Sequence, residues 1–230
     1  MARKKNNLSS GRNLITQTDP KSPISEQYRT IRTNIQFASI DKQIKTIVVT
    51  SSNPGEGKST TIANLAVTFA QQGKKVLLID TDMRKSTVHY TFRLENTTGL
   101  TNVLTKQVKL LEAIKSINES NMDVLTSGPV PPNPAELLGS QSMKDLLDEA
   151  REHYDIILFD SPPLLAVTDA QILSNQCDGV ILVVHSGKTA KEDAQKAKEL
   201  LQTAQAKILG AVINQKKLKA SNYYYYYGNN

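Results

Sequence analysis

A glycine-rich segment at residues 52–60, Ser-Asn-Pro-Gly-Glu-Gly-Lys-Ser-Thr, contains residue types that bind phosphate groups. It lies between a strand-like and a helix-like stretch, as a P-loop requires, and its small residues let backbone N–H groups turn toward phosphate oxygens. Lys58 can reach the β- and γ-phosphates of ATP, and the Ser59 hydroxyl can ligate Mg²⁺. The strict motif has glycine where Ser52 stands, so the match is incomplete. We expect the nucleotide to contact Pro54, Gly55, Glu56, Gly57, Lys58, Ser59 and Thr60.

Three aspartates follow strand-like apolar runs elsewhere in the chain. Asp80 and Asp82 come after Val-Leu-Leu-Ile, and Asp160 comes after Ile-Ile-Leu-Phe, which has the form of a Walker B strand. An aspartate in this position is often only a helix cap. A metal–phosphate site, however, needs carboxylates to hold Mg²⁺, and a hydroxyl substrate needs a base. Three aspartates at the same sheet edge as a P-loop favour the functional interpretation.

Alternating strands and helices must position these residues. We expect strands at 45–50, 75–79, 122–126, 154–159, 179–184 and 207–213, longer helices at 24–39, 58–72, 140–152 and 189–204, and short helices within 99–120 and before 179. Continuous apolar strands of this kind occur in parallel sheets that are covered on both faces. Such sheets bind ligands at the carboxyl ends of their strands. The sequence therefore predicts an α/β, P-loop NTPase-like fold, with a mostly parallel sheet and helices on both faces.

The composition is that of an ordinary soluble domain, with 39% hydrophobic residues and no tryptophan among 230 residues. No apolar run approaches the ~20 residues that a membrane-spanning helix needs. The N-terminal residues are basic and polar, without the apolar stretch of a secretory signal. The single cysteine, Cys177, excludes an internal disulfide and a multi-cysteine metal site. We therefore expect a cytoplasmic protein.

Much of the net charge of +6 lies near the two ends, at residues 3–5 and 216–219. A basic balance can serve nucleic acid, an anionic membrane surface, an acidic partner or only solubility. No nucleic acid is expected, because basic and aromatic residues do not interleave along a strand surface. We expect three parts, namely a flexible basic N-terminus at 1–22, a P-loop domain at 23–215, and a flexible basic and tyrosine-rich tail at 216–230.

Two further segments carry residues that a nucleotide-binding core does not need. Five consecutive tyrosines near the end, Tyr223, Tyr224, Tyr225, Tyr226 and Tyr227, cannot form a helical core stripe because they would point in all directions. They are either a disordered sticky tail or a substrate segment that the preceding lysines steer toward an anionic site. Glu26, Arg29 and Arg32 share one face of the helix expected at 24–39. They form either an intramolecular charged face or a contact with another subunit.

Six features together resemble the bacterial tyrosine kinases of capsule and exopolysaccharide systems, from about residue 20 to the end. Pro-Gly-Glu-Gly-Lys-Ser followed by Leu-Leu-Ile-Asp-x-Asp-x-Arg is similar to their Walker A and A′ motifs, and residues 157–163 are similar to their Walker B motif. Residues 127–138 resemble another characteristic stretch. The Glu-x-x-Arg-x-x-Arg pattern at 26–32 resembles their ring-forming motif, and the tyrosine-rich end resembles their autophosphorylated tail. The similarity is greatest to the separate-chain cytoplasmic kinases of Gram-positive bacteria.

This resemblance implies an ATP-dependent protein-tyrosine kinase domain over 23–215 that phosphorylates its own tail, between subunits of a ring, and regulates capsule or exopolysaccharide synthesis. It implies that Lys58 and the amides of residues 55–60 hold the phosphates. The implied Mg²⁺ ligands are Ser59, Asp82 and Asp160, bound directly or through water. Asp80 is the implied base, although Asp80 and Asp82 could exchange roles.

The resemblance also implies partners. An activating membrane adaptor would use its cytoplasmic tail to recruit the kinase to the inner face of the membrane. The other implied partners are further copies of the chain, protein substrates in polysaccharide synthesis and a cognate tyrosine phosphatase.

Two positions depart from the family pattern, and other function classes compete. Thr81 stands where many members have a smaller residue, and Ser86 stands where proline is usual, so both bear on the geometry beside the implied base. The main rival is a MinD/ParA-like ATPase switch, but its signature lysine is missing at Ser51, Ser52 and Asn53. A redox ATPase similar to the nitrogenase iron protein conflicts with the single cysteine. A pure ATP-binding scaffold has no use for a tyrosine tail.

Overall fold

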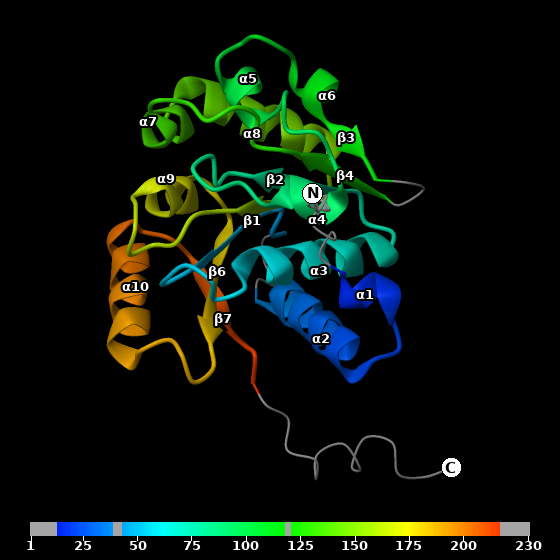
Figure 1. The fold of residues 1–230 in the computed structure, drawn as a ribbon, viewed down its shortest axis with the longest axis vertical. Coiled ribbons are helices and arrows are strands. Elements are labelled where there is room, and N and C mark those ends of the chain that lie inside the picture. The colour runs from blue at the N-terminus through cyan, green and yellow to red at the C-terminus, as the bar shows by residue number, and fades with distance from the viewer. Residues whose placement is uncertain (1–12, 39–42, 118–120, 217–230) are drawn as a thin grey trace, which may run out of the picture.

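The computed structural model describes residues 13–38, 43–117 and 121–216, which form a seven-stranded sheet with helices on both faces (Figure 1). The strand order is β3-β4-β2-β5-β1-β6-β7. Adjacent strands are parallel except for β3 and β4, which are antiparallel. The prediction of a mostly parallel sheet is therefore confirmed. The strands are β1 (Thr46–Ser51), β2 (Val76–Asp80), β3 (Lys115–Ser116), β4 (Met122–Leu125), β5 (Ile156–Asp160), β6 (Gly179–His185) and β7 (Ile208–Asn214).

The helices divide between two apolar cores, one on each face of the sheet. The first core packs against α1 (Ile15–Thr18), α2 (Pro23–Phe37), α3 (Lys58–Gln71) and α4 (Val88–Phe92). The second packs against α5 (Leu100–Leu104), α6 (Leu110–Ala113), α7 (Pro134–Leu138), α8 (Gln141–His153), α9 (Asp169–Gln176) and α10 (Lys191–Thr203). Both layers are visible in Figure 1.

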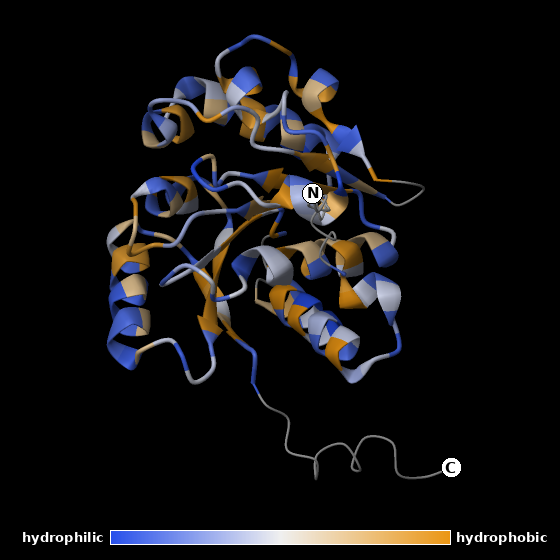
Figure 2. Ribbon diagram, viewed as in Figure 1, coloured by the Kyte–Doolittle hydropathy of each residue, from blue (hydrophilic) through white to orange (hydrophobic). Residues whose placement is uncertain are grey.

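The central strands are apolar along their whole length because both of their faces are covered. In β1, Ile47 and Val49 belong to one core and Val48 to the other, and all three side chains are buried. Figure 2 shows this as hydrophobic strands between helices that carry a hydrophobic and a hydrophilic side. Covered parallel strands give this continuous pattern, whereas half-exposed strands alternate. The sequence pattern therefore predicted the layers as well as the strands.

The sheet brings the predicted site residues to one edge. β1 pairs with both β5 and β6, and β2 pairs with β5, so the segments that follow these central strands start next to one another. Asp80 and Asp160 are register partners at the ends of β2 and β5. Since α3 begins at Lys58, the glycine-rich loop spans the gap between β1 and this helix.

Two expectations about local structure were wrong. The flexible N-terminus was expected to reach residue 22, but Leu14 and Thr16 are buried, and the Thr16 backbone N–H and hydroxyl donate to the Asn64 side chain at 3.1 and 2.9 Å. Residues 99–120 were expected to contain only short helices, but Lys115–Ser116 forms the antiparallel edge strand β3. None of the helices in the described ranges is long and apolar enough to span a membrane.

Candidate active site

The loop between β1 and α3 has a conformation that requires glycine at two positions. Gly55 and Gly57 have φ angles of +77° and +94°, in the left-handed region that L side chains rarely adopt. A β-carbon at Gly57 would also lie 1.9 Å from the Asn214 side-chain nitrogen. Gly57 caps the N-terminus of α3, where unpaired backbone N–H groups attract anions. The loop therefore has the backbone of a phosphate-binding site.

Lys58 connects the loop to two of the aspartates. Its ammonium lies 3.2 Å from Asp82 Oδ2, 3.4 Å from Asp160 Oδ1 and 3.3 Å from Ser59 Oγ. Burial acts to lower the pKa of Lys58, but the charges of Asp160, Asp82 and Asp80 outweigh burial and raise it above its usual value. Lys58 is therefore positively charged in the site, and all three predicted carboxylates lie close enough to influence it.

Asp80 is a buried base candidate and a helix cap at the same time. Its Oδ2 accepts hydrogen bonds from the backbone N–H groups of Thr87 and Val88, both at 3.0 Å, where α4 begins. Its Oδ1 accepts one from the Asp82 N–H at 3.2 Å. Burial, followed by the charge of Asp160, raises the pKa of Asp80 to about 8, against the effects of the Val88 N–H and Lys58. A carboxyl group with such a pKa is suited to general-base chemistry near neutral pH.

Asp160 has features of an incomplete ion site. Its side chain is fully buried, and its Oδ2 has no hydrogen-bond partner in the described part of the chain. Burial raises the pKa of Asp160, while Lys58 and Ser59 oppose that shift. An unpartnered buried carboxylate oxygen is costly, which favours a ligand that completes the site.

The donor set around Asp160 fits Mg²⁺. Two carboxylates and the Ser59 hydroxyl supply hard oxygen ligands, and Mg²⁺ at phosphate sites takes one or two carboxylates together with substrate phosphates and water. The described residues contain no group of three or more His, Cys, Asp or Glu side chains that could hold a metal alone. Phosphate and water oxygens would therefore have to complete the coordination.

Glu56 does not direct its carboxylate toward a ligand. Its Oε2 accepts a hydrogen bond from the Ser52 N–H at 2.9 Å, and its Oε1 accepts one from the Thr189 hydroxyl at 2.6 Å. Its backbone oxygen accepts one from the Asn214 side chain at 3.0 Å. Glu56 is only 2% exposed, so a contact with phosphate is left to its backbone N–H. Of the other loop residues expected at the nucleotide, Ser59 lies beside Lys58, Thr60 is half-buried, and Pro54 and Gly55 are exposed.

Thr81 ties the loop after β2 to the end of β5. Its backbone N–H and its hydroxyl both donate to the Asp160 backbone oxygen, at 2.9 and 2.8 Å. A glycine, alanine or cysteine at this position would lack the hydroxyl bond, so Thr81 adds a link between two site aspartates. The sequence showed Thr81 only as a departure from a pattern and gave no signal for this role. Ser86, the other departure, accepts a hydrogen bond from the Asn96 side chain at 3.3 Å.

Arg84 anchors the same loop to α9. Its Nε and one terminal nitrogen donate to the two carboxylate oxygens of Asp169, at 3.0 and 3.1 Å. The Asp169 side chain is completely buried, and the ion pair with Arg84 offsets the cost of burying its charge. Arg84 belonged to the sequence motif, but Asp169 was missed because it lies 85 residues away in the chain with no motif of its own.

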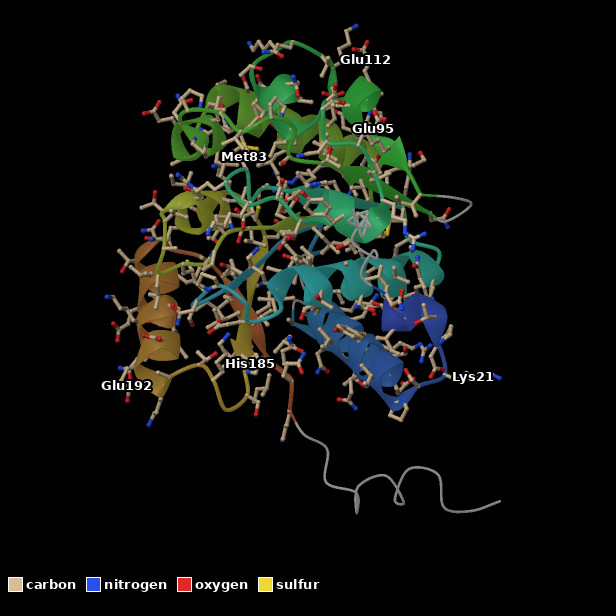
Figure 3. All side chains as sticks on the ribbon, in the orientation of Figure 1. Lys21, Met83, Glu95, Glu112, His185 and Glu192 are labelled. Carbon is tan, nitrogen blue, oxygen red and sulfur yellow. The ribbon has the colours of Figure 1, made fainter. Side chains whose placement is uncertain are left out.

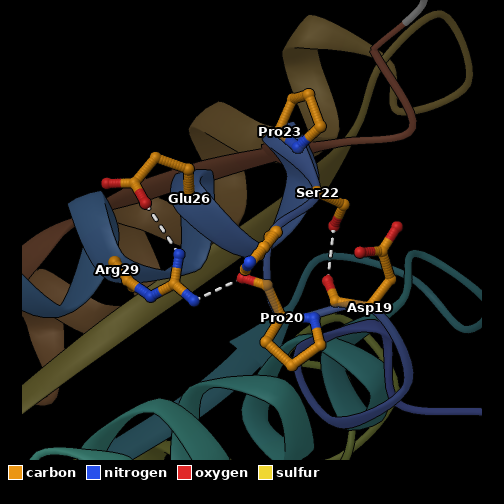
Figure 4. Close-up of a pocket in the computed structure, with 7 residues that line it drawn as sticks. Asp19, Pro20, Ser22, Pro23, Glu26 and Arg29 are labelled. Atoms are coloured by element: carbon orange, nitrogen blue, oxygen red, sulfur yellow. Dashed lines mark hydrogen bonds and ion pairs between the residues drawn. The ribbon is translucent and has the colours of Figure 1, made fainter.

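The charged face of α2 forms contacts within the chain. Arg29 pairs with Glu26 at 2.7 Å and donates to the Pro20 backbone oxygen, beside a hollow of about 530 Å³ (Figure 4). Arg32 donates to the Thr68 backbone oxygen at 2.7 Å, and its Nε is buried without a partner among the described residues. These contacts are those of an intramolecular charged face, one of the two alternatives for these residues. The Glu26 side chain is nevertheless 63% exposed. The five tyrosines at 223–227 lie outside the described residues.

Comparison with known proteins gives consistent matches. A protein-family model described as an AAA domain matches residues 44–216. The tyrosine-protein kinase YwqD of Bacillus subtilis is 63% identical over 217 residues, which cover 94% of this chain and 92% of that relative. The tyrosine-protein kinase CpsD of Streptococcus pneumoniae serotype 4 is 42% identical over 199 residues, covering 86% of this chain and 87% of the relative.

Solved structures agree with these relatives. The crystal structure of the chimerical protein CapA2B2 has a TM-score of 0.87 and 45% identity, and the match covers 90% of this chain and 92% of that chain. The cell division ATPase MinD of Pyrococcus furiosus shares the fold at a lower TM-score of 0.64 and 25% identity, covering 76% of this chain and 74% of that chain. The comparison therefore favours the kinases over the ATPase switch.

Proposed function

This chain belongs to the bacterial tyrosine-protein kinases, and we propose that its Lys58 cluster transfers the γ-phosphoryl group of ATP to tyrosines at its own C-terminus. One observation carries this proposal. The P-loop lysine lies within 3.4 Å of both Asp82 and Asp160, and Asp80 is the register partner of Asp160. Phosphate-binding groups and a base candidate with a raised pKa therefore share one sheet edge.

The proposed reaction moves one phosphoryl group and one proton. Lys58 and the loop N–H groups hold the phosphates of ATP. The tyrosine oxygen forms a bond to the γ-phosphorus, and the bond between that phosphorus and the β–γ bridging oxygen breaks. The electron pair of the broken bond leaves with ADP. Asp80, in its ionised form, accepts the tyrosine proton. The ordinary tyrosine pKa is about 10, and the pKa of Asp80 is about 8. Asp80 is therefore closer in pKa to the tyrosine hydroxyl than an ordinary aspartate is.

Asp82 and Asp160 are assigned to the metal side of the site. Both accept a hydrogen bond from the Lys58 ammonium, whereas Asp80 accepts hydrogen bonds from backbone N–H groups at the start of α4. With Ser59 they would hold Mg²⁺, which when bound shields the charge on the phosphates. This division supports Asp80, rather than Asp82, as the base.

The proposed phosphoacceptors are Tyr223, Tyr224, Tyr225, Tyr226 and Tyr227. β7 ends at Asn214, which contacts the phosphate loop, and nine residue steps separate Asn214 from Tyr223 (223 − 214 = 9). At ~3.3–3.6 Å per residue, such a segment spans at most ~32 Å. We propose that it enters the site of a neighbouring subunit. Subunits would form a ring through Glu26, Arg29 and Arg32, with the exposed Glu26 exchanging its internal partner for a neighbour's arginine.

The biological setting is also a proposal. The names of the relatives and the resemblance of the motifs support a kinase that regulates capsule or exopolysaccharide synthesis. A membrane adaptor would activate it through a cytoplasmic tail and bring it to the inner face of the cell membrane. Proteins of polysaccharide synthesis would be further substrates, and a tyrosine phosphatase would reverse the reaction.

A mixing assay tests this function. A Lys58→Met chain with intact tyrosines is mixed with an active chain whose five tail tyrosines are all phenylalanine, in Mg·ATP with the candidate adaptor tail. Mass spectrometry of residues 220–230 should find phosphate on the Lys58→Met chain, because only transfer between chains can label it. Label on wild type but not on this chain would restrict the reaction to one chain. ATP hydrolysis without any phosphotyrosine would contradict the kinase assignment of the site.

A further inference from the structure

The connection between β6 and α10, residues 186–190, is fastened to the phosphate loop. Figure 3 labels His185 and Glu192, which lie on either side of it. The Thr189 hydroxyl donates to Glu56 at 2.6 Å and accepts a hydrogen bond from the His185 N–H at 2.9 Å. Four residues after Thr189, Asp193 in α10 accepts a hydrogen bond from the Asn53 side chain at 2.7 Å. The bonds to Glu56 and Asn53 join residues 133 and 140 apart in the chain.

Lys188 is the residue that this connection presents to the loop. Its ammonium lies 3.5 Å from the position that a β-carbon on Gly55 would occupy. The side chain is exposed, and within the described ranges its ammonium has neither a hydrogen bond nor an ion pair. A positive charge therefore lies beside the phosphate loop without a partner among the described residues.

Lys188 does not lie beside the loop in order to neutralise the Glu56 carboxylate. Each oxygen of the Glu56 carboxylate already accepts a hydrogen bond, one from Ser52 and one from Thr189, and neither involves a lysine. Lys58, at the other end of the loop, is engaged by Asp82 and Asp160. The two lysines thus flank the loop, and only Lys188 is uncommitted.

We propose that Lys188 is a second phosphate-binding lysine of this site, which contacts phosphate oxygens of the bound nucleotide beside Gly55. Thr189 and Asp193 act as positioning residues, because their bonds to the loop fix where the connection lies. This inference rests on the proposal that the loop holds ATP. Lys188 lies 130 residues after Lys58 (188 − 58 = 130) and is part of no motif, so only the fold brings it to the site.

Nucleotide binding by the full-length chain tests the proposal. Fluorescent ATP and ADP are titrated into wild type, Lys188→Gln, Lys188→Arg and Lys191→Gln. Lys191→Gln is the matched control, since Lys191 is exposed in the same region and the change in charge is identical. Loss of one charged contact near the surface should weaken ATP and ADP binding about five- to tenfold in Lys188→Gln. Lys188→Arg and Lys191→Gln should bind as wild type does.

Two further readouts separate ligand contact from altered structure. Binding to Lys188→Gln should depend less on salt, because one screened attraction is gone, while competition by adenosine, which has no phosphate, should be unchanged. Thr189→Val should weaken ATP binding in the wild-type background but add little in the Lys188→Gln background.

The outcomes are distinct. Equal ATP affinity for wild type and Lys188→Gln would overturn the role of Lys188. An equal loss of affinity in Lys191→Gln would also overturn it, since the effect would then be one of general charge. If wild type fails to bind ATP, or binds it as weakly as Lys58→Met does, the failure lies instead in the proposed nucleotide site.

Discussion

Replacing Asp80 by asparagine should change how stability depends on pH as well as catalysis. In the unfolded chain this carboxyl group has an ordinary pKa near 4, whereas burial and Asp160 raise its pKa to about 8 in the folded protein. Between these values the folded state binds a proton that the unfolded state lacks. The stability linked to this proton is complete below about pH 4 and is lost as pH rises through about 8, because ionisation in the buried site is unfavourable.

The size of the effect follows from the linkage relation. With folded and unfolded pKa values of about 8 and 4, ionisation of Asp80 should lower the free energy of unfolding by about 1.6 kcal/mol between pH 6.5 and pH 8. Burial, followed by the charge of Lys115, lowers the pKa of His89, so its contribution to stability rises with pH until the ordinary histidine pKa has been passed. Both chains carry His89, so this contribution cancels in the comparison. Asp80→Asn removes this dependence. It also leaves one backbone N–H donor facing an amide group, which adds a roughly pH-independent cost of about 1–3 kcal/mol.

Urea unfolding of nucleotide-free wild type and Asp80→Asn at several pH values from 6.5 to 8 measures the difference in slope. Wild type should lose stability relative to the variant as pH rises, whatever the absolute offset between them. Curves that stay parallel would show that Asp80 does not titrate between pH 6.5 and pH 8, and would contradict a folded-state pKa of about 8.

The same variant tests the catalytic role. Removal of a general base typically costs 10²–10⁴-fold in rate, roughly speaking, so tyrosine phosphorylation by Asp80→Asn should fall by about that factor while ATP affinity changes little. A phosphotransfer rate close to that of wild type would remove Asp80 as the base.

Three further changes test separate parts of the site. Gly57→Ala should lower the free energy of unfolding, measured by chemical denaturation, by about 2–3 kcal/mol and abolish nucleotide binding, because the new β-carbon would collide with the Asn214 side chain. Gly73→Ala is the matched control, since Gly73 has a similar φ of +85° but open space around it, and it should cost only about 1 kcal/mol. Arg84→Met should destabilise the protein by about 1–2 kcal/mol in the same measurement, because it removes both hydrogen bonds that Arg84 donates to the buried Asp169 carboxylate. Asp148→Asn, at an exposed ion pair, should change stability by less than about 0.5 kcal/mol, and equal effects would contradict the role of burial. Asp160→Asn should raise the Mg²⁺ concentration needed for half-maximal phosphorylation severalfold, and an unchanged Mg²⁺ titration would exclude Asp160 from metal binding.

The sequence predicted the parts of the fold that depend on local pattern. Val76–Asp80 and Ile156–Asp160 are continuous apolar strands that end in an aspartate, so the sequence predicted both the strands and the site residues. Gly55 and Gly57 have positive φ angles, so the glycine-rich pattern also predicted the turn. The predicted gathering of Lys58, Asp82 and Asp160 at one edge of the sheet is confirmed by their distances. The structure adds that Asp80 and Asp160 are register partners in the sheet.

The missed features depend on contacts between distant or very short segments. A four-residue helix such as α1 has no measurable period, and its place is fixed by a hydrogen bond between Thr16 and Asn64 rather than by its own pattern. β3 has two residues, too few for alternation to show. The bond between Thr189 and Glu56 joins residues 133 apart, which spacing along the chain cannot reveal.

The bridging position of Lys58 has a consequence for the proposed nucleotide site. One ammonium lies within 3.4 Å of oxygens of Ser59, Asp82 and Asp160, the same oxygens that would hold Mg²⁺ there. If the proposed site binds Mg·ATP, a metal cation would take over the neutralisation of these carboxylates, and the lysine would be free to face the phosphates. Release of Mg·ADP would then return the lysine to the carboxylates, so that they would keep a positive neighbour at both stages.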